Sequence, residues 1–293
     1  MKDFEYHSPR TLEEACQLLK KYDGKARVLA GGTDLIPGMY RREIAPEQVI
    51  NLKGIPGLNF IALEESKGLF LGSLVNFNEI IYSPIIEKHY PILKEVSRKI
   101  ASHQIRNLAT IGGNLCNAAP SADSAPVLIA LDSAVTLIGP GSKERTLPLE
   151  KFFTGPGETA LAPGEILVQI HIPLPKPRTG ISYIKQMTRR ALEIAVVGVT
   201  ALVQLEKKTE KCSSIRLVIG ACAPTPLRVP AAEEILIGKK ITDQDIEAAA
   251  QAASEAVKPI TDVRASKLYR KEMVKVQCKR ALEEANSRAQ ASS

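Results

Sequence analysis

Two spacings of apolar residues divide the chain into expected helices and strands. Leu12, Ala15, Cys16 and Leu19 recur at helical spacing behind Thr11-Leu12-Glu13-Glu14, which predicts a helix opened by a capping box. Similar patterns predict helices at 76–82 and 91–101. Short apolar runs between glycine or proline predict strands at 4–6, 27–30, 48–52, 60–63, 69–72, 134–138 and 165–172. The first 55 or so residues are therefore expected to form a compact βαβ unit.

The chain changes character after the proline-rich segment at 173–177, which we interpret as a linker. Beyond it, strands are predicted at 195–206 and 215–222, and helices at 231–237, 243–257 and 264–284. A small antiparallel sheet covered by helices fits this order. We therefore expect two domains, residues 1–176 and residues 177–293, the first divided into lobes at about 1–55 and 56–176.

Composition narrows the class of protein. The chain has 293 residues, 44% of them hydrophobic and 24% charged, which is typical of a globular protein with a substantial core. No apolar run approaches the roughly 20 residues that a membrane helix needs. The polar start of the chain does not resemble a secretory signal, so a cytoplasmic protein without a membrane span is expected.

The cysteines argue against a metal centre or a disulfide framework in this chain. Cys16, Cys116, Cys212, Cys222 and Cys278 are scattered, with no C-x-x-C pair, and their number is odd. We therefore expect no metal ligands in this chain.

Charge raises the question of a nucleic-acid partner. The net charge is +7, and much of the excess lies between Arg264 and Arg280, where Glu272 is the one acidic residue. No interleaved aromatic residues or recognition motif accompany this run. We interpret it as a solvated or subunit-facing helix and expect no nucleic-acid binding.

Two glycine pairs carry the candidate chemistry. The chain reads A-G-G-T-D at 30–34, directly after a predicted strand, and T-I-G-G-N at 110–114. A turn without Cβ atoms lets backbone amides and short polar side chains converge on an anion, and a diphosphate is the natural guest. One such turn would be ordinary, but two copies favour a binding site. Neither is a Rossmann G-x-G-x-x-G or a P-loop.

Two other segments have competing interpretations. His103 lies before the second glycine pair; a structural histidine is favoured over a catalytic base, and we expect no catalytic residue in this chain. The segment 152–157, F-F-T-G-P-G, is either a loop that approaches a ring or a turn held by two core phenylalanines.

Taken together, the motifs resemble those of the flavin-binding medium subunits of the molybdenum hydroxylases, the family of xanthine dehydrogenase and carbon monoxide dehydrogenase. The resemblance covers nearly the whole chain. Besides the two glycine segments it rests on Q-I-R-N at 104–107, S-A-D at 121–123, G-E-I-L at 164–167, Lys185, P-T-P-L-R at 224–228 and R-A-S-K-L-Y-R at 264–270.

The resemblance implies an α+β fold: a two-lobed FAD-binding domain of the vanillyl-alcohol-oxidase-like (PCMH) type, followed by the small sheet-and-helix domain. It implies that FAD lies between these domains and that both glycine segments cradle its pyrophosphate. The implied pyrophosphate-binding residues are Val28, Leu29, Ala30, Gly31, Gly32, Thr33, Asp34, Leu35, Ala109, Thr110, Ile111, Gly112, Gly113 and Asn114.

Four further positions match flavin-contacting positions of the family. Asp123 would bind a ribityl or ribose hydroxyl, Leu167 would pack on the cofactor, and Lys185 would contribute charge or a hydrogen bond. Ile100 falls where some relatives place a phenylalanine over the flavin ring, and an aliphatic side chain cannot stack there in the same way. Glu193 replaces an aspartate that many relatives have.

The resemblance also implies partners. A large subunit would carry the molybdenum cofactor and a small subunit two [2Fe–2S] clusters, in a dimer of heterotrimers, and this chain would pass electrons through FAD to NAD+. Segments 116–126 and 223–228 resemble the purine enzymes, so xanthine is the first substrate expected. Carbon monoxide, nicotinate and other N-heterocycles stay open. The absence of an added cysteine cluster argues against 4-hydroxybenzoyl-CoA reductase. A diaphorase that acts alone and a non-redox nucleotide-binding module also stay open.

Overall fold

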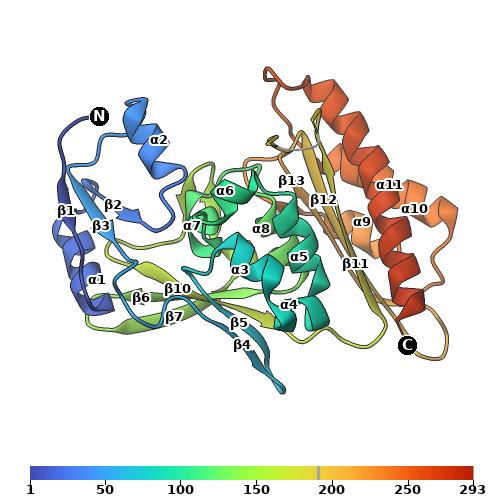
Figure 1. Cartoon of the computed structure of the whole chain (residues 1–293). Helices are drawn as coiled ribbons and strands as arrows, with labels where there is room; N and C mark the ends of the chain where they lie inside the picture. The colour runs from blue at the N-terminus through green and yellow to red at the C-terminus, as the bar shows by residue number, and fades with distance from the viewer. Residues whose placement is uncertain (190–191, 293) are drawn as a thin grey trace.

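The computed structural model describes residues 1–189 and 192–292, and these residues form four sheets. Figure 1 shows a small lobe at the N-terminal end, a central sheet covered by helices, and a C-terminal sheet with long helices on its outer face. No helix among the described residues has the length and apolar character needed to span a membrane.

The N-terminal lobe is a three-stranded parallel sheet of order β1-β3-β2. Its elements are β1 (Glu5–His7), α1 (Leu12–Lys21), β2 (Ala26–Leu29), α2 (Leu35–Tyr40) and β3 (Gln48–Asn51). The predicted βαβ unit is thus present, with α2 inside the β2–β3 crossover. Thr11 caps α1, but Glu14 accepts from the Arg10 N–H instead of the Thr11 N–H, so half of the predicted capping box is absent.

The central sheet is antiparallel, with order β4-β5-β10-β6-β7. Its strands are β4 (Ile61–Glu64), β5 (Gly68–Gly72), β6 (Ala134–Gly139), β7 (Lys143–Pro148) and β10 (Ile166–Pro173). Its helices are α3 (Phe77–Tyr82), α4 (Pro84–His89), α5 (Pro91–Arg98), α6 (His103–Arg106), α7 (Ile111–Asn117) and α8 (Ser124–Ala130). The sequence pattern did not predict β7 because this edge strand is mostly exposed and polar.

The segment at 152–157 has features of both interpretations, because its two phenylalanines lie in the core and Gly157 lines the cavity described below. It follows the short helix η1 (Leu149–Lys151) and forms a hairpin of β8 (Phe153–Gly155) and β9 (Glu158–Thr159). Phe152 and Phe153 are buried in the core, where their rings pack edge to face. Neither ring is therefore free to approach a ligand.

The C-terminal sheet has the order β11-β12-β13-β14 and is antiparallel. Its strands are β11 (Thr179–Gln186), β12 (Val197–Leu205), β13 (Cys212–Gly220) and β14 (Leu227–Arg228), and its helices are α9 (Pro230–Glu234), α10 (Asp243–Ala256) and α11 (Lys267–Ala291). Helices α5 and α8 pack on the opposite face, so this sheet is sandwiched between helices. The sequence pattern missed β11 because its buried positions include the polar Ser182 and Lys185.

Part of the basic run on and before α11 forms ion pairs within the chain. Arg264 and Arg270 pair with Asp262, and Arg270 is buried. Lys275 and Lys279 both pair with Glu247 on α10. Much of the basic run therefore joins the C-terminal elements together.

The capping box of α10 should make stability depend on acid pH. Hydrogen bonds from Lys239 and Thr242 lower the pKa of Asp245 to about 2. A lowered pKa stabilises the fold above the unfolded-state pKa, near 3.8, and this contribution is lost as the pH falls toward 2. Asp245→Asn should therefore cost about 1–2 kcal/mol of unfolding free energy at pH 7 and much less at pH 2.5, measured by urea unfolding. Asp243→Asn, in the exposed first turn of α10, is the control; an equal loss there would contradict the assignment.

Candidate functional site

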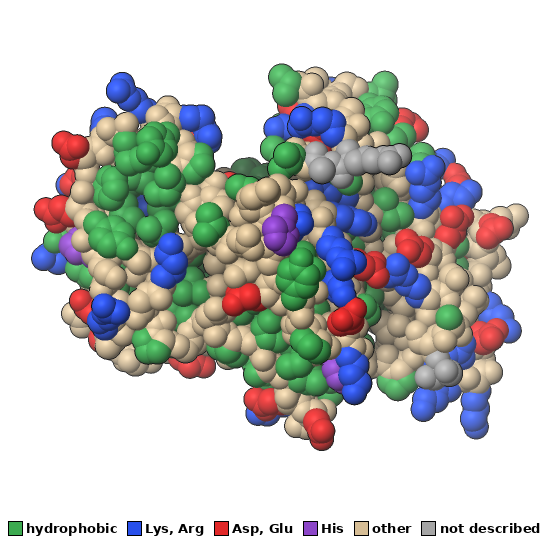
Figure 2. Space-filling model, in the orientation of Figure 1, with side chains coloured by type: hydrophobic (Ala, Val, Ile, Leu, Met, Phe, Trp, Pro, Cys, Tyr) green, Lys and Arg blue, Asp and Glu red, His purple; other side chains and the backbone are tan. Residues whose placement is uncertain are grey.

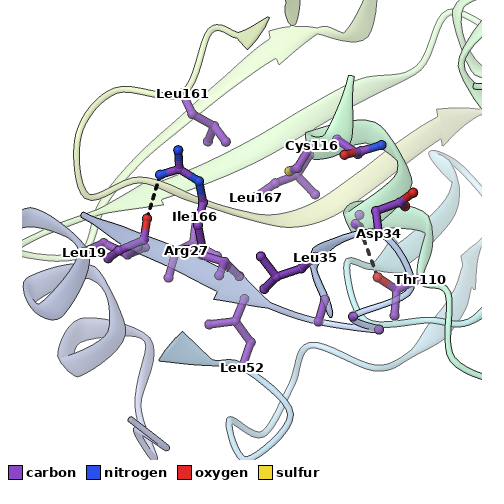
Figure 3. A pocket seen from close by; sticks show the side chains of 18 of the residues that line it. Leu19, Arg27, Asp34, Leu35, Leu52, Thr110, Cys116, Leu161, Ile166 and Leu167 are labelled. Atoms are coloured by element: carbon purple, nitrogen blue, oxygen red, sulfur yellow. Dashed lines mark hydrogen bonds between the residues drawn. The ribbon is translucent and has the colours of Figure 1, made fainter. Parts of the chain in front are cut away.

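A cavity of about 860 Å³ lies between the N-terminal lobe and the central sheet. The N-terminal lobe contributes the end of α1, strand β2, the turn after it and α2, whereas the central part contributes the start of α7 and the segment at 161–167. Figure 2 shows a hollow in the surface beside this lobe, and Figure 3 shows the cavity from close by.

The first glycine segment presents unpaired amides to this cavity. The backbone N–H groups of Gly31, Gly32, Thr33 and Asp34 donate to no protein acceptor in the described part of the chain, and all four residues line the cavity. Consecutive amides left without partners at a turn form a concave site for an anion. Gly32 has a φ of +73°, which favours glycine. The segment therefore fits a diphosphate.

Gly31 is held against the second lobe. A Cβ atom on Gly31 would lie 2.1 Å from the Leu108 carbonyl oxygen and 3.0 Å from the Ala109 Cα. Because backbone atoms cannot yield as a flexible side chain can, this position requires glycine. Direct contact of Gly31 with the backbone of Leu108 and Ala109 therefore fixes the position of the turn.

The second glycine segment differs from the sequence-based expectation. It was expected to be a turn with amides free for an anion, but it forms the first turn of α7, capped by Thr110. The Ile111 N–H donates to Val75 O, Gly112 N–H to Ser73 O, Gly113 N–H to Thr110 Oγ1, and Asn114 N–H to Thr110 O. The amides needed for an anion are thus already used by the protein.

Close packing against Ser73 requires glycine at position 112. A Cβ atom there would lie 2.6 Å from both the Ser73 carbonyl oxygen and the Ser73 Cβ. A side chain at Gly112 would therefore be stopped by Ser73 rather than by a ligand. Gly113 has more room, since its nearest obstacles are Thr110 Oγ1 at 2.9 Å and Ala30 Cβ at 3.8 Å.

Most of the predicted FAD-binding residues line the same cavity. These are Val28, Ala30, Gly31, Gly32, Thr33, Asp34, Leu35, Ala109, Thr110, Gly112, Gly113, Asn114 and Leu167. Three others are elsewhere: Leu29 packs beside Gly32, and Ile100 and Ile111 belong to the hydrophobic core. The assignment of these residues to FAD stays a prediction.

Asp123 and Lys185 form a buried network away from the cavity lining. Asp123 Oδ1 accepts from the Tyr183 hydroxyl at 2.5 Å, and Asp123 Oδ2 accepts from Lys185 Nζ at 2.8 Å. Lys185 Nζ also donates to Lys99 O at 2.9 Å, while Lys99 Nζ donates to Tyr183 O at 2.6 Å. The network joins the ends of α5 and α8 to β11.

Burial dominates the electrostatics of this network. Burial raises the pKa of Asp123, whereas the ion pair with Lys185 and the hydrogen bond from Tyr183 lower it. Burial also raises the pKa of Tyr183 and lowers that of Lys99. The sequence could not point to Tyr183 or Lys99, because an isolated tyrosine or lysine carries no pattern.

The structure adds cavity residues that no motif marked. Among the lining residues outside the predicted FAD-binding set are Leu19, Arg27, Leu52, Cys116, Leu161 and Ile166 (Figure 3), and polar or charged ones such as Asp23, Glu43 and Asn117. Burial raises the pKa of the Cys116 thiol to about 12, so it is a neutral, unreactive group at neutral pH. Within residues 1–189 and 192–292, no cluster of His, Cys, Asp and Glu could hold a metal ion.

Family models match almost the whole chain. Residues 2–175 match the FAD binding domain in molybdopterin dehydrogenase, and residues 182–285 match the CO dehydrogenase flavoprotein C-terminal domain. The fold and the cavity thus define a flavoprotein of this two-part architecture. The chain belongs to the FAD-binding medium subunits of the molybdenum hydroxylases.

Relatives in sequence have several different names. The chain is 34% identical over 281 residues to the xanthine dehydrogenase FAD-binding subunit of Escherichia coli O157:H7, covering 96% of this chain and 95% of the relative. It is 35% identical over 285 residues to the carbon monoxide dehydrogenase medium chain of Hydrogenophaga pseudoflava, covering 97% and 98%. The nicotinate dehydrogenase FAD-subunit of Eubacterium barkeri is 34% identical over 278 residues, covering 94% and 93%.

Solved structures agree on the fold. A carbon monoxide dehydrogenase of Hydrogenophaga pseudoflava that lacks the Mo-pyranopterin moiety superposes with a TM-score of 0.94 at 36% identity, covering 98% of both chains. Quinoline 2-oxidoreductase of Pseudomonas putida 86 superposes with a TM-score of 0.91 at 27% identity, covering 99% of both chains. Similar chains therefore serve enzymes with different substrates.

Proposed function

We propose that this chain binds the diphosphate of FAD on the amides of Gly31, Gly32, Thr33 and Asp34. The observation that carries the proposal is that these N–H groups have no acceptor within the described residues and border the interlobe cavity. A charged acceptor makes such hydrogen bonds about twice as strong as neutral ones. The diphosphate would then hold the N-terminal lobe at the position that Gly31 and Leu108 define.

The work of the chain's own residues is binding and orientation. When bound, FAD supplies a redox centre that exchanges electrons with iron–sulfur clusters and with a nicotinamide acceptor. Segment 31–34 anchors the charged middle of the cofactor, and Leu167 bounds the cavity on the side of β10. Contact of Asp123 and Lys185 with the ribityl chain or the flavin is proposed from the resemblance alone, because both side chains lie away from the cavity lining. No side chain here is assigned a proton transfer.

The proposal includes the assembly and the acceptor. A large molybdenum-cofactor subunit and a small [2Fe–2S] subunit would complete a cytoplasmic dimer of heterotrimers that passes electrons to NAD+. Of the two proposed domains, residues 1–176 would hold the main binding site. Residues 177–293 would contain the sheet that supports the network around Asp123. Xanthine is the proposed substrate of the complex, supported by segments 116–126 and 223–228, which resemble the purine enzymes.

Other substrates are the second candidates. Carbon monoxide and nicotinate are proposed as alternatives because the chain is as similar to the subunits named for them, at 35% and 34% identity, as to the xanthine enzyme's subunit at 34%. A lone diaphorase and a non-redox nucleotide-binding module are candidates from different classes of protein, and the unpaired amides would serve either of them as well.

Purification of the native complex through a tag on this chain tests the proposal. We expect FAD in a 1:1 ratio to this chain, a larger and a smaller partner chain, molybdenum and iron, and NAD+ reduction that requires xanthine. Turnover with carbon monoxide or nicotinate instead would replace the substrate and leave the FAD assignment intact. NADH oxidation by a partner-free flavoprotein would identify a diaphorase, and a chain without flavin would contradict the FAD site.

A further inference from the structure

The N-terminal lobe meets the central part at two places that border the interlobe cavity. One is the contact of Gly31 with Leu108 described above. The other is α1, which lies beside the ends of β6 and β7 (Figure 1). An added Cβ at Gly164 would lie 3.2 Å from the Cys16 carbonyl oxygen, so α1 also packs closely on the segment before β10. Leu19 at the end of α1 and Gly164 both line the cavity, and the position of α1 therefore sets one of its walls.

Apolar packing alone does not fix the angle of α1. The buried face of this helix shares a hydrophobic cluster with Ile166 and Val168 of β10, and apolar burial is non-directional. Hydrogen bonds supply direction, and in the described part of the chain only Glu13 and Cys16 of this lobe form hydrogen bonds with the central part. The Cys16 thiol is a weak donor, 3.4 Å from the Ile138 carbonyl oxygen. Glu13 is therefore the main polar anchor of the lobe.

The Glu13 carboxylate binds the turn between β6 and β7. Oε1 and Oε2 accept from the Gly141 N–H at 3.0 and 2.8 Å, and Oε2 accepts from the Ser142 N–H at 3.0 Å. Two consecutive amides that converge on one carboxylate form a concave anion site. Gln17 Nε2 donates to Oε1 at 2.7 Å and orients the carboxylate. The hydrogen bonds from Gln17 and the Gly141 amide lower the pKa of Glu13, so the group is ionised at neutral pH and its hydrogen bonds are charge-assisted.

We infer that Glu13 is a positioning residue, which sets the spacing between the two walls of the interlobe cavity by holding the β6–β7 turn. The inference rests on the proposed FAD function and deepens it, because Glu13 itself does not line the cavity. Without this carboxylate the lobe can tilt about the contact between Gly31 and Leu108, and only the docked orientation presents both walls to the cofactor. A fall of the docked fraction to about one tenth raises the apparent dissociation constant about tenfold.

Binding of FAD to the flavin-free full-length chain, measured by titration calorimetry, tests this role. Glu13→Ala removes both acceptor oxygens and should weaken FAD binding about tenfold. Glu13→Gln keeps one acceptor oxygen, so its dissociation constant should lie between those of Glu13→Ala and the unaltered chain. Glu14→Gln is the matched control: it removes a carboxylate from the same first turn of α1, but one that accepts from the Arg10 N–H within the lobe. This control should bind FAD as tightly as the unaltered chain.

Amide hydrogen exchange gives a readout that a residue with a purely structural role would not change. Coupling between two sites is reciprocal, so bound FAD should slow the exchange of the Gly141 and Ser142 amides, although neither residue lines the cavity. In Glu13→Ala these two amides should exchange rapidly with or without FAD. The amides of the β4–β5 turn at 65–67 are the control and should not respond to FAD.

The outcomes separate this inference from the function on which it rests. If the unaltered chain binds FAD, but Glu13→Ala binds it equally tightly or Glu14→Gln weakens it as much, then Glu13 does not position the lobe. Exchange at Gly141 and Ser142 that is indifferent to FAD would overturn the inference as well. If the unaltered chain binds no FAD, the proposed FAD function fails and the positioning role with it.

Discussion

A Gly31→Ala variant is expected to bind FAD about 100-fold more weakly than the unaltered chain. The added Cβ would lie 2.1 Å from the Leu108 carbonyl oxygen, so the turn has to move away from the second lobe. Overpacking of this kind costs about 1–3 kcal/mol, and here the displaced amides are those that face the cavity. Flavin content after purification and FAD titration of the stripped chain measure the effect.

Gly54→Ala provides the matched control. Gly54 lies in the same lobe, and the nearest atom to an added Cβ, the Pro9 carbonyl oxygen, is 3.4 Å away, which is a tolerable contact. FAD binding should be unchanged in this variant. A Gly31→Ala protein that purifies with a full complement of flavin would falsify the role of the first glycine turn.

Removing Lys185 should destabilise the fold strongly. Lys185→Met leaves the Asp123 carboxylate buried with the Tyr183 hydroxyl as its remaining partner. Breaking one side of a buried ion pair costs about 3–5 kcal/mol, because the uncompensated charge stays in the interior. Denaturant unfolding of the flavin-free chain should show this loss, so that the result does not depend on cofactor binding.

Two comparisons isolate the buried charge as the cause. Asp123→Asn combined with Lys185→Met removes both charges and should recover part of the lost stability. Lys25→Met breaks the exposed pair with Glu47, in which both side chains are 61% accessible, and should cost less than about 1 kcal/mol. Equal losses of unfolding free energy for Lys25→Met and Lys185→Met would show that burial does not determine how much the Asp123–Lys185 pair contributes to stability.

These two predictions concern different parts of the molecule. The turn at 31–34 depends on backbone contact between lobes, and the network around Asp123 depends on the C-terminal sheet, which delivers Tyr183 and Lys185 from β11. If a Lys185 variant loses FAD, the unfolding measurement is needed to show how much of the loss comes from lower stability. Gly31→Ala, by contrast, acts on the amides directly.

The sequence by itself determined the order of most elements and the location of the first glycine turn. Periodicity is a local property, so α1, β2, β3 and α10 could be predicted from spacing and capping residues alone. Strands β7 and β11 were not predicted, because neither shows an alternation of apolar and polar residues. The edge strand β7 is mostly exposed, and β11 has polar residues at buried positions. The motifs, taken together, also indicated the family to which the chain belongs.

Only the tertiary structure decided which polar groups are free. The two glycine pairs look alike in sequence, but the amides at 111–114 donate to Ser73 and Val75, just after β5, and to Thr110, whereas those at 31–34 have no acceptor among the described residues. The same is true of Asp123, whose partners lie 60 and 62 positions away along the chain. A hydrogen bond depends on which distant atoms the fold brings within reach, and local spacing does not carry that information.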